Sequence, residues 1–348
     1  MLKEYESGVA PDGQPFNCLV LGDEGGLQIA LMDWGATWLS CQLPLKSGAK
    51  REVLLGCPTP ADYLRQTAFL GATIGRYANR IANASISLDK QSWALNANQG
   101  PHQLHGGSEG FNAKRWTCVE HTTSTALYQL DSADGDQGFP GNLQAKVRYT
   151  LTAEGAVLID YRATVDKPCP VNLTNHAYFH LDGANSDIRR QKLQLYANQY
   201  LPVDSDGIPC APLTDVDNTG MDFRRPKLIA QDFLRDRDQQ RVKGYDHAYL
   251  LYPACHDGDS PAAQLWSADD QVLLQVYTTA PALQLYTGNF LAGTPARQGG
   301  EYQNYSGVAL ESEFLPDSPH HPEWPQPGCW LQPGQAYHSQ TRYQLTAL

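Results

Sequence analysis

The 348-residue sequence has no long apolar run, no excess of positive charge and no recognisable leader segment. No stretch approaches the roughly 20 apolar residues that a membrane-spanning helix requires. Residues 1–6 carry no basic segment followed by an apolar one, so we expect no signal peptide. Lysine and arginine number 26 against 37 aspartates and glutamates, and the net charge of −11 opposes binding to nucleic acid or to an anionic membrane.

Paired cysteines are also missing, because none of the eight cysteines belongs to a Cys-x-x-Cys motif. A chain of this length can bury a large core without a disulfide or a metal ion. We therefore expect free thiols in a reducing, cytoplasmic compartment. The cysteines are Cys18, Cys41, Cys57, Cys118, Cys169, Cys210, Cys255 and Cys329.

Several signatures of other enzyme classes are absent. Ser312 lacks the Gly-x-Ser-x-Gly elbow of a serine hydrolase, and neither type of Gly-rich nucleotide-binding loop is present. Four histidines, at positions 102, 105, 176 and 180, could be drawn as a metal site. However, the sequence has no His-Glu-x-x-His motif and no cysteine pair near them, so we expect no metal.

Alternating apolar and polar residues, the pattern of half-buried strands, dominate the sequence. In residues 144–152 the alternation is regular, and residues 157–165 resume it after a short turn, which predicts a hairpin. Similar strand signals occupy residues 84–95, 271–285 and 336–348. Many short strands without a linker or repeat predict one domain over residues 1–348, folded as an all-β, large antiparallel β-sandwich.

Helical patterns are scarce. Residues 60–66 predict one or two turns that begin at a proline, and residues 228–242 predict a short, polar helix. Arg76 and Arg80, four residues apart, would share one face of a strand, where a surface ion pair is the simplest interpretation.

Five segments combine polar residues of catalytic type with turn residues or aromatics. Each is weak evidence by itself, since a histidine such as His176 is as often a hydrogen-bonded core residue as a catalyst. The segments are residues 75–83, 100–107, 172–181, 244–250, and 286–290 with 309–314.

Taken together and in this order, these segments resemble the aldose 1-epimerase family, also called galactose mutarotases, over nearly the whole chain. The most specific segment is NLTNHAYFHL (172–181), where the family pattern is Asn-x-Thr-Asn-His-x-Tyr-Phe-Asn-Leu. His180 stands where the family has asparagine, a departure that concerns a supporting contact or a strand pairing. Other similar stretches are GRYANRIANA (75–84), QLHGG (103–107), YDHAYLL (245–251), YTGNFL (286–291) and ALESEFLPDSPHHPEWP (309–325), the last two close to the bacterial form.

The resemblance implies a cofactor-independent β-sandwich enzyme that interconverts the α and β anomers of a free hexose such as galactose or glucose. Glu311 matches the general base and His176 matches the general acid. The positions that match the lining of the sugar pocket are Asn79, Arg80, His105, Tyr178, Asp246 and Gln284, of which His105 resembles a second active-site imidazole.

These residue types suit the implied reaction. Ring opening removes a proton from the anomeric hydroxyl and adds one to the ring oxygen, and a positioned acid and base each contribute roughly 10²–10⁴-fold. A glutamate is ionised at pH 7, and an imidazole with a pKa near 6.5 reaches both proton states. The only partner we expect is the small neutral sugar, with the chain a monomer or a homodimer.

Alternatives remain within this interpretation. Glu313 would share a strand face with Glu311 and is a rival base, whereas His247 should point away from the face of Asp246 and be structural. A hexose-6-phosphate 1-epimerase would need a cationic cluster for the phosphate. A non-catalytic sugar-binding protein on the same scaffold would typically lose the acid or the base, and both are present here.

Overall fold

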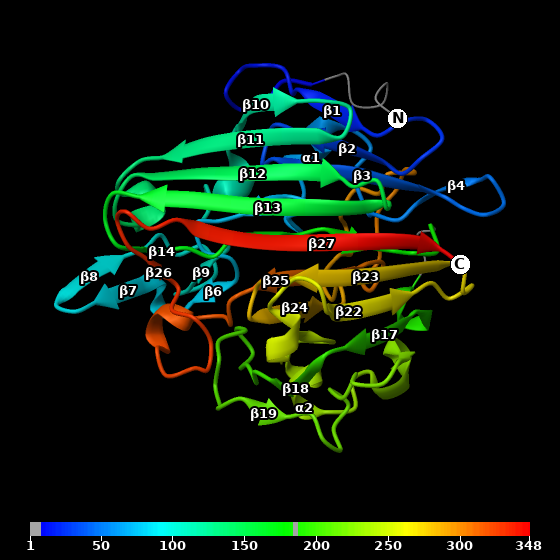
Figure 1. Ribbon diagram of the computed structural model, residues 1–348. Helices are drawn as coiled ribbons and strands as arrows, with labels where there is room; N and C mark the ends of the chain where they lie inside the picture. The colour runs from blue at the N-terminus through cyan, green and yellow to red at the C-terminus, as the bar shows by residue number, and fades with distance from the viewer. Residues whose placement is uncertain (1–7, 184–186) are drawn as a thin grey trace.

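The computed structural model describes residues 8–183 and 187–348, and most of its regular structure is β-strand (Figure 1). The ladders between the named strands are antiparallel, which confirms the predicted all-β, antiparallel β-sandwich. None of the helices in the described ranges combines the length and the apolar composition needed to cross a membrane. Helical segments are α1 (Pro60–Tyr63), α2 (Arg237–Arg241) and the 3₁₀ turns Ala82–Ala84, Phe111–Ala113, Asp136–Gly138, Ile188–Arg190, Ile229–Asp232, Pro253–Cys255 and Ser318–His320.

A nine-stranded sheet forms one broad layer of the molecule (Figure 1). It contains the predicted hairpin, β12 with β13, and the C-terminal strand β27 lies at its centre beside β13 and β23. In order, its strands are β10 (Thr117–His121), β11 (Thr125–Ser132), β12 (Leu143–Leu151), β13 (Ala156–Val165), β27 (Tyr337–Ala347), β23 (Val272–Thr278), β22 (Pro261–Trp266), β17 (Lys192–Leu195) and β20 (Lys227–Leu228).

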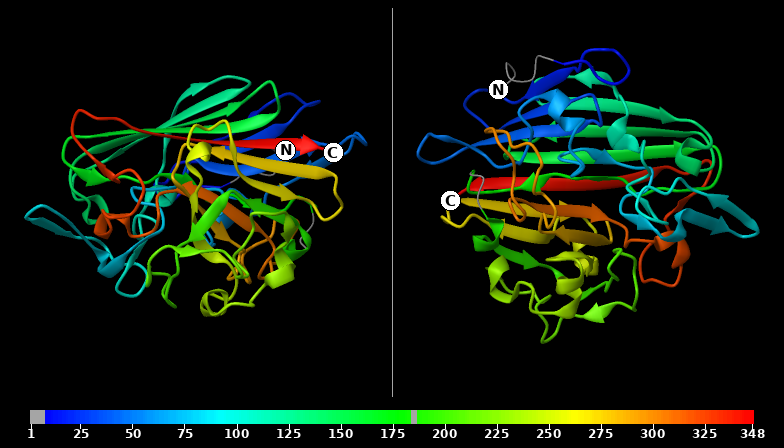
Figure 2. Two further views of the ribbon diagram at one scale, coloured as in Figure 1. Left: turned by 60° about the horizontal axis from the view of Figure 1, so that its bottom comes forward. Right: turned by 180° about the vertical axis from the view of Figure 1, so that it is seen from behind.

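A six-stranded sheet packs against one side of this layer (Figures 1 and 2). In order, its strands are β16 (Tyr178–Phe179), β25 (Val308–Glu313), β24 (Ala282–Tyr286), β21 (Asp246–Leu251), β18 (Ala197–Tyr200) and β19 (Thr214–Asp215).

Smaller sheets complete the fold. A four-stranded sheet near the N-terminus consists of β1 (Cys18–Leu21), β2 (Gln28–Met32), β3 (Thr37–Pro44) and β4 (Lys50–Glu52). The two-stranded pairs are β5 (Thr73–Ile74) with β15 (Thr174–Asn175), β6 (Arg80–Ile81) with β9 (Gln103–Leu104), β7 (Ser85–Leu88) with β8 (Gln91–Ala94), and β14 (Cys169–Pro170) with β26 (Trp330–Leu331).

The main core lies between the two large sheets. Leu285 and Leu310 of the six-stranded sheet belong to the same buried cluster as Tyr343 and Leu345 of β27. The hydroxyl of Tyr343 donates a hydrogen bond to the carbonyl of Leu310 at 3.3 Å, which joins the two layers. Because side chains alternate along a strand, Glu311, which follows Leu310 on β25, faces the opposite side of the sheet, away from this core.

Two segments differ from the sequence predictions. Residues 271–285 contain two strands that belong to different sheets, β23 and β24, because the chain turns at residues 279–281. Residues 228–242 form a 3₁₀ turn and the short helix α2 instead of one helix. Leu234, between them, has a left-handed backbone (φ 59°), which cannot continue a right-handed helix.

The expected surface ion pair involving Arg76 and Arg80 is wrong. Arg76 is 2% exposed, and its guanidinium donates to the hydroxyl of Ser132 at 2.9 Å and to the carbonyl of Gly141 at 2.9 Å. It also donates to the carbonyls of Ser132, Ala133 and Pro140. The alternation rule fails here because only Arg80–Ile81 of this segment is a strand. Arg76 therefore anchors the segment that precedes Asn79 and Arg80 to the 132–141 loop.

We predict that Arg76→Leu lowers the free energy of unfolding by about 3 kcal/mol or more, because it leaves several buried carbonyl groups without donors. Denaturant unfolding should measure this loss. Arg162→Leu on β13 is the matched control, since this arginine side chain is 66% exposed and its replacement should cost less than about 1 kcal/mol. Equal losses in the two variants would contradict the anchoring role.

Candidate functional site

A cavity of about 200 Å³ opens beside the six-stranded sheet, on the face opposite the main core. All eight residues singled out from the sequence line it, so the structure brings together segments that are up to 232 positions apart. These residues are Asn79, Arg80, His105, His176, Tyr178, Asp246, Gln284 and Glu311. Thr67, Ala68, Phe69, Gln99, Leu104, Tyr286 and Phe290 complete the lining.

The register of the six-stranded sheet explains half of this set. Glu311 of β25 lies opposite Gln284 of β24, and Asp246 of β21 lies opposite Tyr286 of β24. Tyr178 of β16 lies opposite Ala309, two positions before Glu311. Residues at cross-strand positions with the same parity share a face, so one face of the sheet presents these polar side chains to the cavity.

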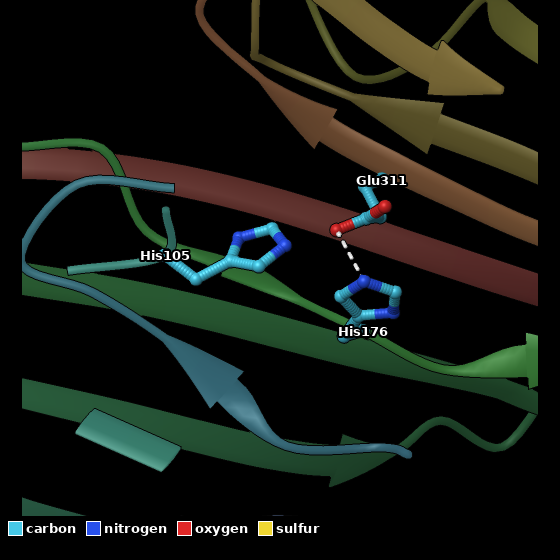
Figure 3. Close-up of side chains that lie close together, drawn as sticks. All are labelled: His105, His176 and Glu311. Atoms are coloured by element: carbon cyan, nitrogen blue, oxygen red, sulfur yellow. Dashed lines mark ion pairs between the residues drawn. The ribbon is translucent and has the colours of Figure 1, made fainter. Parts of the chain in front are cut away.

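His176 enters the cavity from the end of β15. Its backbone N–H donates to the carbonyl of Ala72 at 2.9 Å, and the side chain of the preceding Asn175 turns toward the nine-stranded sheet to donate to Tyr149. The imidazole of His176 is stacked between the rings of Phe69, at 5.8 Å, and Tyr178, at 4.9 Å. Its Nε2 atom lies 3.6 Å from Oε2 of Glu311 (Figure 3). Local pairing and aromatic packing therefore aim the imidazole at the carboxyl group.

His105 contributes a second imidazole, whose proton position follows from its hydrogen bond. The backbone N–H of Asn79 donates to Nδ1 of His105 at 3.1 Å, and the N–H of His105 donates back to the carbonyl of Asn79 at 2.9 Å. Burial, with the nearby His176 and Arg80, holds the pKa of His105 well below its usual value. A neutral imidazole that accepts at Nδ1 carries its proton on Nε2. Nε2 of His105 can therefore donate a hydrogen bond on the side of the ring where His176 and Glu311 lie (Figure 3).

Arg80 is the only arginine or lysine among the described residues that line the cavity. Its Nε donates to Oε1 of Gln99 at 2.9 Å, and its Nη1 donates to Oδ1 of Asn79 at 3.3 Å. These two amides hold the guanidinium in place. Its positive charge opposes the rise in pKa that burial causes at Asp246 and Glu311.

Burial moves the two facing groups His176 and Glu311 toward their uncharged forms. It lowers the pKa of His176 to about 3. Burial, reinforced by the negative charges of Glu313 and Asp246, holds the pKa of Glu311 well above its usual value. The expectation that His176 reaches both proton states near pH 7 is therefore not met. Both shifts favour a neutral imidazole beside a protonated carboxyl group.

Asp246 and Gln284 offer acceptors for sugar hydroxyls. Nε2 of Gln284 donates to Oδ1 of Asp246 at 2.6 Å, which fixes both side chains. Oε1 of Gln284 is buried and has no hydrogen-bond partner among the described residues. A buried acceptor without a partner is costly, so this atom favours a ligand that donates a hydrogen bond.

His105, His176 and Glu311 also form the kind of group that binds a metal ion, since their nearest ligand atoms lie within 4.8 Å of one another. The hydrogen bond of His105 disfavours this use. A metal-binding imidazole usually donates its other ring N–H to an acceptor, but Nδ1 of His105 accepts a hydrogen bond from the backbone N–H of Asn79. The cavity-facing Nε2 of His105 is thus protonated, and a protonated nitrogen has no lone pair for a metal ion.

The remaining histidines and the rival glutamate lie outside the cavity. Nδ1 of His180 is 2.8 Å from the carbonyl of Ser306, so this histidine links the end of β16 to the loop before β25. His247 is buried on the core side of β21, as expected, and contacts the ring of Tyr200. Glu313 shares the strand face of Glu311, as expected, but it is absent from the cavity lining and its carboxyl contacts Asn79.

Sequence reasoning did not select Phe69, Gln99 or Tyr286. Phe69 has a left-handed backbone (φ 56°), which no sequence pattern marks for a phenylalanine. Gln99 lies in a loop, and its role depends on where Arg80 points. Tyr286 could have been found, since it lies two residues after Gln284 and shares its strand face.

The chain is similar to known proteins over nearly its full length. A family model described as aldose 1-epimerase matches residues 17–344. An aldose 1-epimerase of Escherichia coli is 58% identical over 347 residues, with 100% of both chains covered. An aldose 1-epimerase of Haemophilus influenzae is 48% identical over 338 residues, with 97% of both chains covered. The crystal structure of a galactose 1-epimerase from Lactobacillus acidophilus superimposes with a TM-score of 0.84 at 28% identity, covering 99% of this chain and 97% of that one.

We predict that Gly106→Ala destabilises the protein and displaces His105 in the cavity. Gly106 has φ +83°, and an added Cβ would lie 2.0 Å from the carbonyl oxygen of Gly75, so the loop that carries His105 must move. Denaturant unfolding should show a loss of about 2–3 kcal/mol or more. Gly135→Ala is the matched control: it has nearly the same φ, +84°, but no atom within 4 Å, so only about 1 kcal/mol should be lost. Equal losses would contradict the steric explanation.

Proposed function

The chain belongs to the aldose 1-epimerase family, and we propose that it interconverts the α and β anomers of free hexoses such as galactose, with Glu311 and His176 carrying the two proton transfers. The observation that carries this proposal is the 3.6 Å approach of Nε2 of His176 to Oε2 of Glu311 inside the polar cavity. Similar proteins are known as aldose 1-epimerase and galactose 1-epimerase, and these names support the substrate class.

In the proposed reaction, the carboxylate of Glu311 removes the proton from the anomeric hydroxyl. The imidazolium of His176 gives a proton to the ring oxygen, and the bond between this oxygen and the anomeric carbon breaks. The resulting aldehyde turns about the bond to the next carbon, and the hydroxyl then attacks its other face. During closure, Glu311 gives its proton to the carbonyl oxygen and His176 takes back the proton of the attacking hydroxyl. The enzyme therefore gains or loses no atom or electron over the cycle.

A single proton held by Glu311 and His176 together is consistent with this reaction cycle. The resting form, with a carboxylic acid and a neutral imidazole, has the same proton count as the reactive form, with a carboxylate and an imidazolium. A sugar whose anomeric hydroxyl donates to Glu311 and whose ring oxygen accepts from His176 stabilises the reactive form. Arg80 supports it further, because its charge favours the ionised carboxylate.

The other lining residues suit recognition of a neutral sugar. Nε2–H of His105 and the guanidinium of Arg80 are donors, and Asp246 and Gln284 supply acceptors. The rings of Tyr178 and Phe69 border the imidazole and offer an apolar surface to a pyranose ring. We propose that these residues bind and orient the sugar beside the acid and the base.

The charge of the cavity favours a free sugar over a hexose 6-phosphate. A phosphate group would need several cationic partners. Only Arg80 supplies positive charge among the described lining residues, and two carboxyl groups, of Asp246 and Glu311, lie in the same lining. A phosphorylated substrate would therefore find one cationic partner among these residues instead of the several that it needs. Glu313 is disfavoured as the base because it does not line the cavity.

We further propose a cytoplasmic location and a monomer or homodimer that works as one unit. All eight cysteines lie in the described residues and are free thiols, which supports a reducing compartment. The family match over residues 17–344 supports one functional unit.

We predict that Glu311→Gln lowers kcat on freshly dissolved α-galactose by roughly 10²–10⁴-fold, the usual contribution of a general base. The decay of optical rotation, corrected for the buffer rate, measures the reaction. Calorimetric titration with galactose should show nearly unchanged affinity, because the amide has the size of the carboxyl group. Glu120→Gln, an exposed glutamate on β10, is the control and should behave as the parent. A Glu311→Gln enzyme as fast as the parent would disprove the assignment of the base.

We also predict that kcat/KM stays level as the pH falls from 7 through the ordinary imidazole value of about 6.5. The active pair holds one proton, and it gains a second only when His176 is protonated, for which the pKa is about 3. As the pH rises, activity should fall when Glu311 loses its proton, at a pH well above the usual glutamate value. Optical rotation at several pH values, with each buffer rate subtracted, provides the test. A loss of activity centred near pH 6.5 on acidification would contradict the shared-proton arrangement.

A further inference from the structure

Glu313 is a second buried carboxyl group next to the site, and the proposed reaction does not use it. It is 1% exposed and follows Glu311 by two residues on the same face of β25. It does not line the sugar cavity but a separate cavity of about 310 Å³. Its Oε1 accepts a hydrogen bond from Nδ2 of Asn79 at 2.9 Å. A buried carboxyl group is costly, so the hydrogen bond from Asn79, its one side-chain hydrogen bond among the described residues, indicates its role.

Asn79 connects Glu313 to two residues that line the sugar cavity. Oδ1 of Asn79 accepts from the backbone N–H of Arg80 at 2.9 Å and from Nη1 of Arg80 at 3.3 Å. The backbone N–H of Asn79 donates to Nδ1 of His105 at 3.1 Å. Asn79 has a left-handed backbone (φ 63°), a conformation that asparagine adopts more readily than most residues, and its side-chain contacts with Arg80 and Glu313 add to what holds it there.

The amide of Asn79 needs a fixed orientation to perform this function. Its oxygen must face the guanidinium of Arg80, because a flipped amide would direct N–H groups at other N–H groups. An acceptor on the opposite side of the amide decides between the two orientations. Oε1 of Glu313 is that acceptor.

We propose that Glu313 is a positioning residue, which fixes the amide of Asn79 and, through it, the guanidinium of Arg80 and the imidazole of His105. This inference rests on the proposed function for its effect on the reaction rate. It assigns Glu313 no contact with the sugar.

The proton state of Glu313 indicates which replacement should work. Burial raises the pKa of Glu313 to about 8, although the hydrogen bond from Asn79 and the charge of Arg80 oppose this rise. Glu313 is therefore mostly uncharged near pH 7. An uncharged carboxyl group that accepts one hydrogen bond closely resembles a glutamine amide, so glutamine can take over its task and leucine cannot.

The experiment compares Glu313→Gln, Glu313→Leu and the control Ser312→Ala. Ser312 is the adjacent residue of β25, buried on the other face, and its hydroxyl has no hydrogen-bond partner in the protein. We expect kcat/KM for α-galactose to fall about 10–100-fold in Glu313→Leu, whereas Glu313→Gln should remain within about threefold of the parent. Ser312→Ala should match the parent.

A double-mutant comparison tests the route through Asn79. If Glu313 acts through this amide, then Asn79→Ala combined with Glu313→Leu should lose no more activity than the more damaging single change. Additive losses would overturn the proposed route. A Glu313→Gln enzyme that is slower than the parent by about 10-fold or more would also overturn it, and this outcome remains decisive if Glu313→Leu does not fold.

Nitrogen NMR of ¹⁵N-histidine-labelled protein gives a readout that does not require activity. The parent and Glu313→Gln should show His105 with its proton on Nε2, whereas Glu313→Leu or Asn79→Ala should show mixed tautomers. An unchanged His105 signal in both disruptive variants would refute the positioning role. If the parent did not accelerate mutarotation, the proposed function would fail, and the NMR result would still decide the role of Glu313.

Discussion

Three carboxyl groups close to a single guanidinium define the electrostatics of this site. Asp246, Glu311 and Glu313 project from one face of the six-stranded sheet, and the charge of Arg80 acts on all three. Burial raises the pKa of each of these carboxyl groups, and the single positive charge of Arg80 only opposes that rise. Burial also lowers the pKa of the imidazoles of His105 and His176, so both kinds of group are shifted toward their uncharged forms.

The proposed base and the proposed acid come from two different kinds of element. Glu311, the proposed base, belongs to a paired strand in a sheet that is packed against the main core. His176, the proposed acid, follows a two-residue strand and is stacked between the rings of Phe69 and Tyr178. His105 depends on a mutual pair of hydrogen bonds with Asn79. Each group is thus fixed by a separate device, and all three meet in one cavity (Figure 3).

The same arrangement explains why a neutral sugar suits the cavity. Its polar atoms are divided between donors and acceptors, and among the described lining residues the one cation, Arg80, already donates to two amides. A substrate with its own negative charge would need more cationic partners than this single guanidinium. The departure of His180 from the family asparagine leaves this chemistry intact, because that imidazole contacts the carbonyl of Ser306 outside the cavity.

Much of the fold could be predicted from the sequence because apolar and polar residues alternate along a half-buried strand. The β12–β13 hairpin and β27 follow this rule, and so does the shared face of Glu311 and Glu313. The rule fails where the chain is irregular: Arg76 was placed on the surface, and residues 271–285 were read as one stretch although they cross between two sheets.

The sequence by itself determined the residue types of the site and, through their ordered motifs, the resemblance to a known family. Only the tertiary structure decided that Glu311 lines the cavity while Glu313 supports Asn79, because both residues have the same local pattern. It also decided the proton positions. A pKa depends on burial and on neighbouring charges, and those neighbours come from distant parts of the chain.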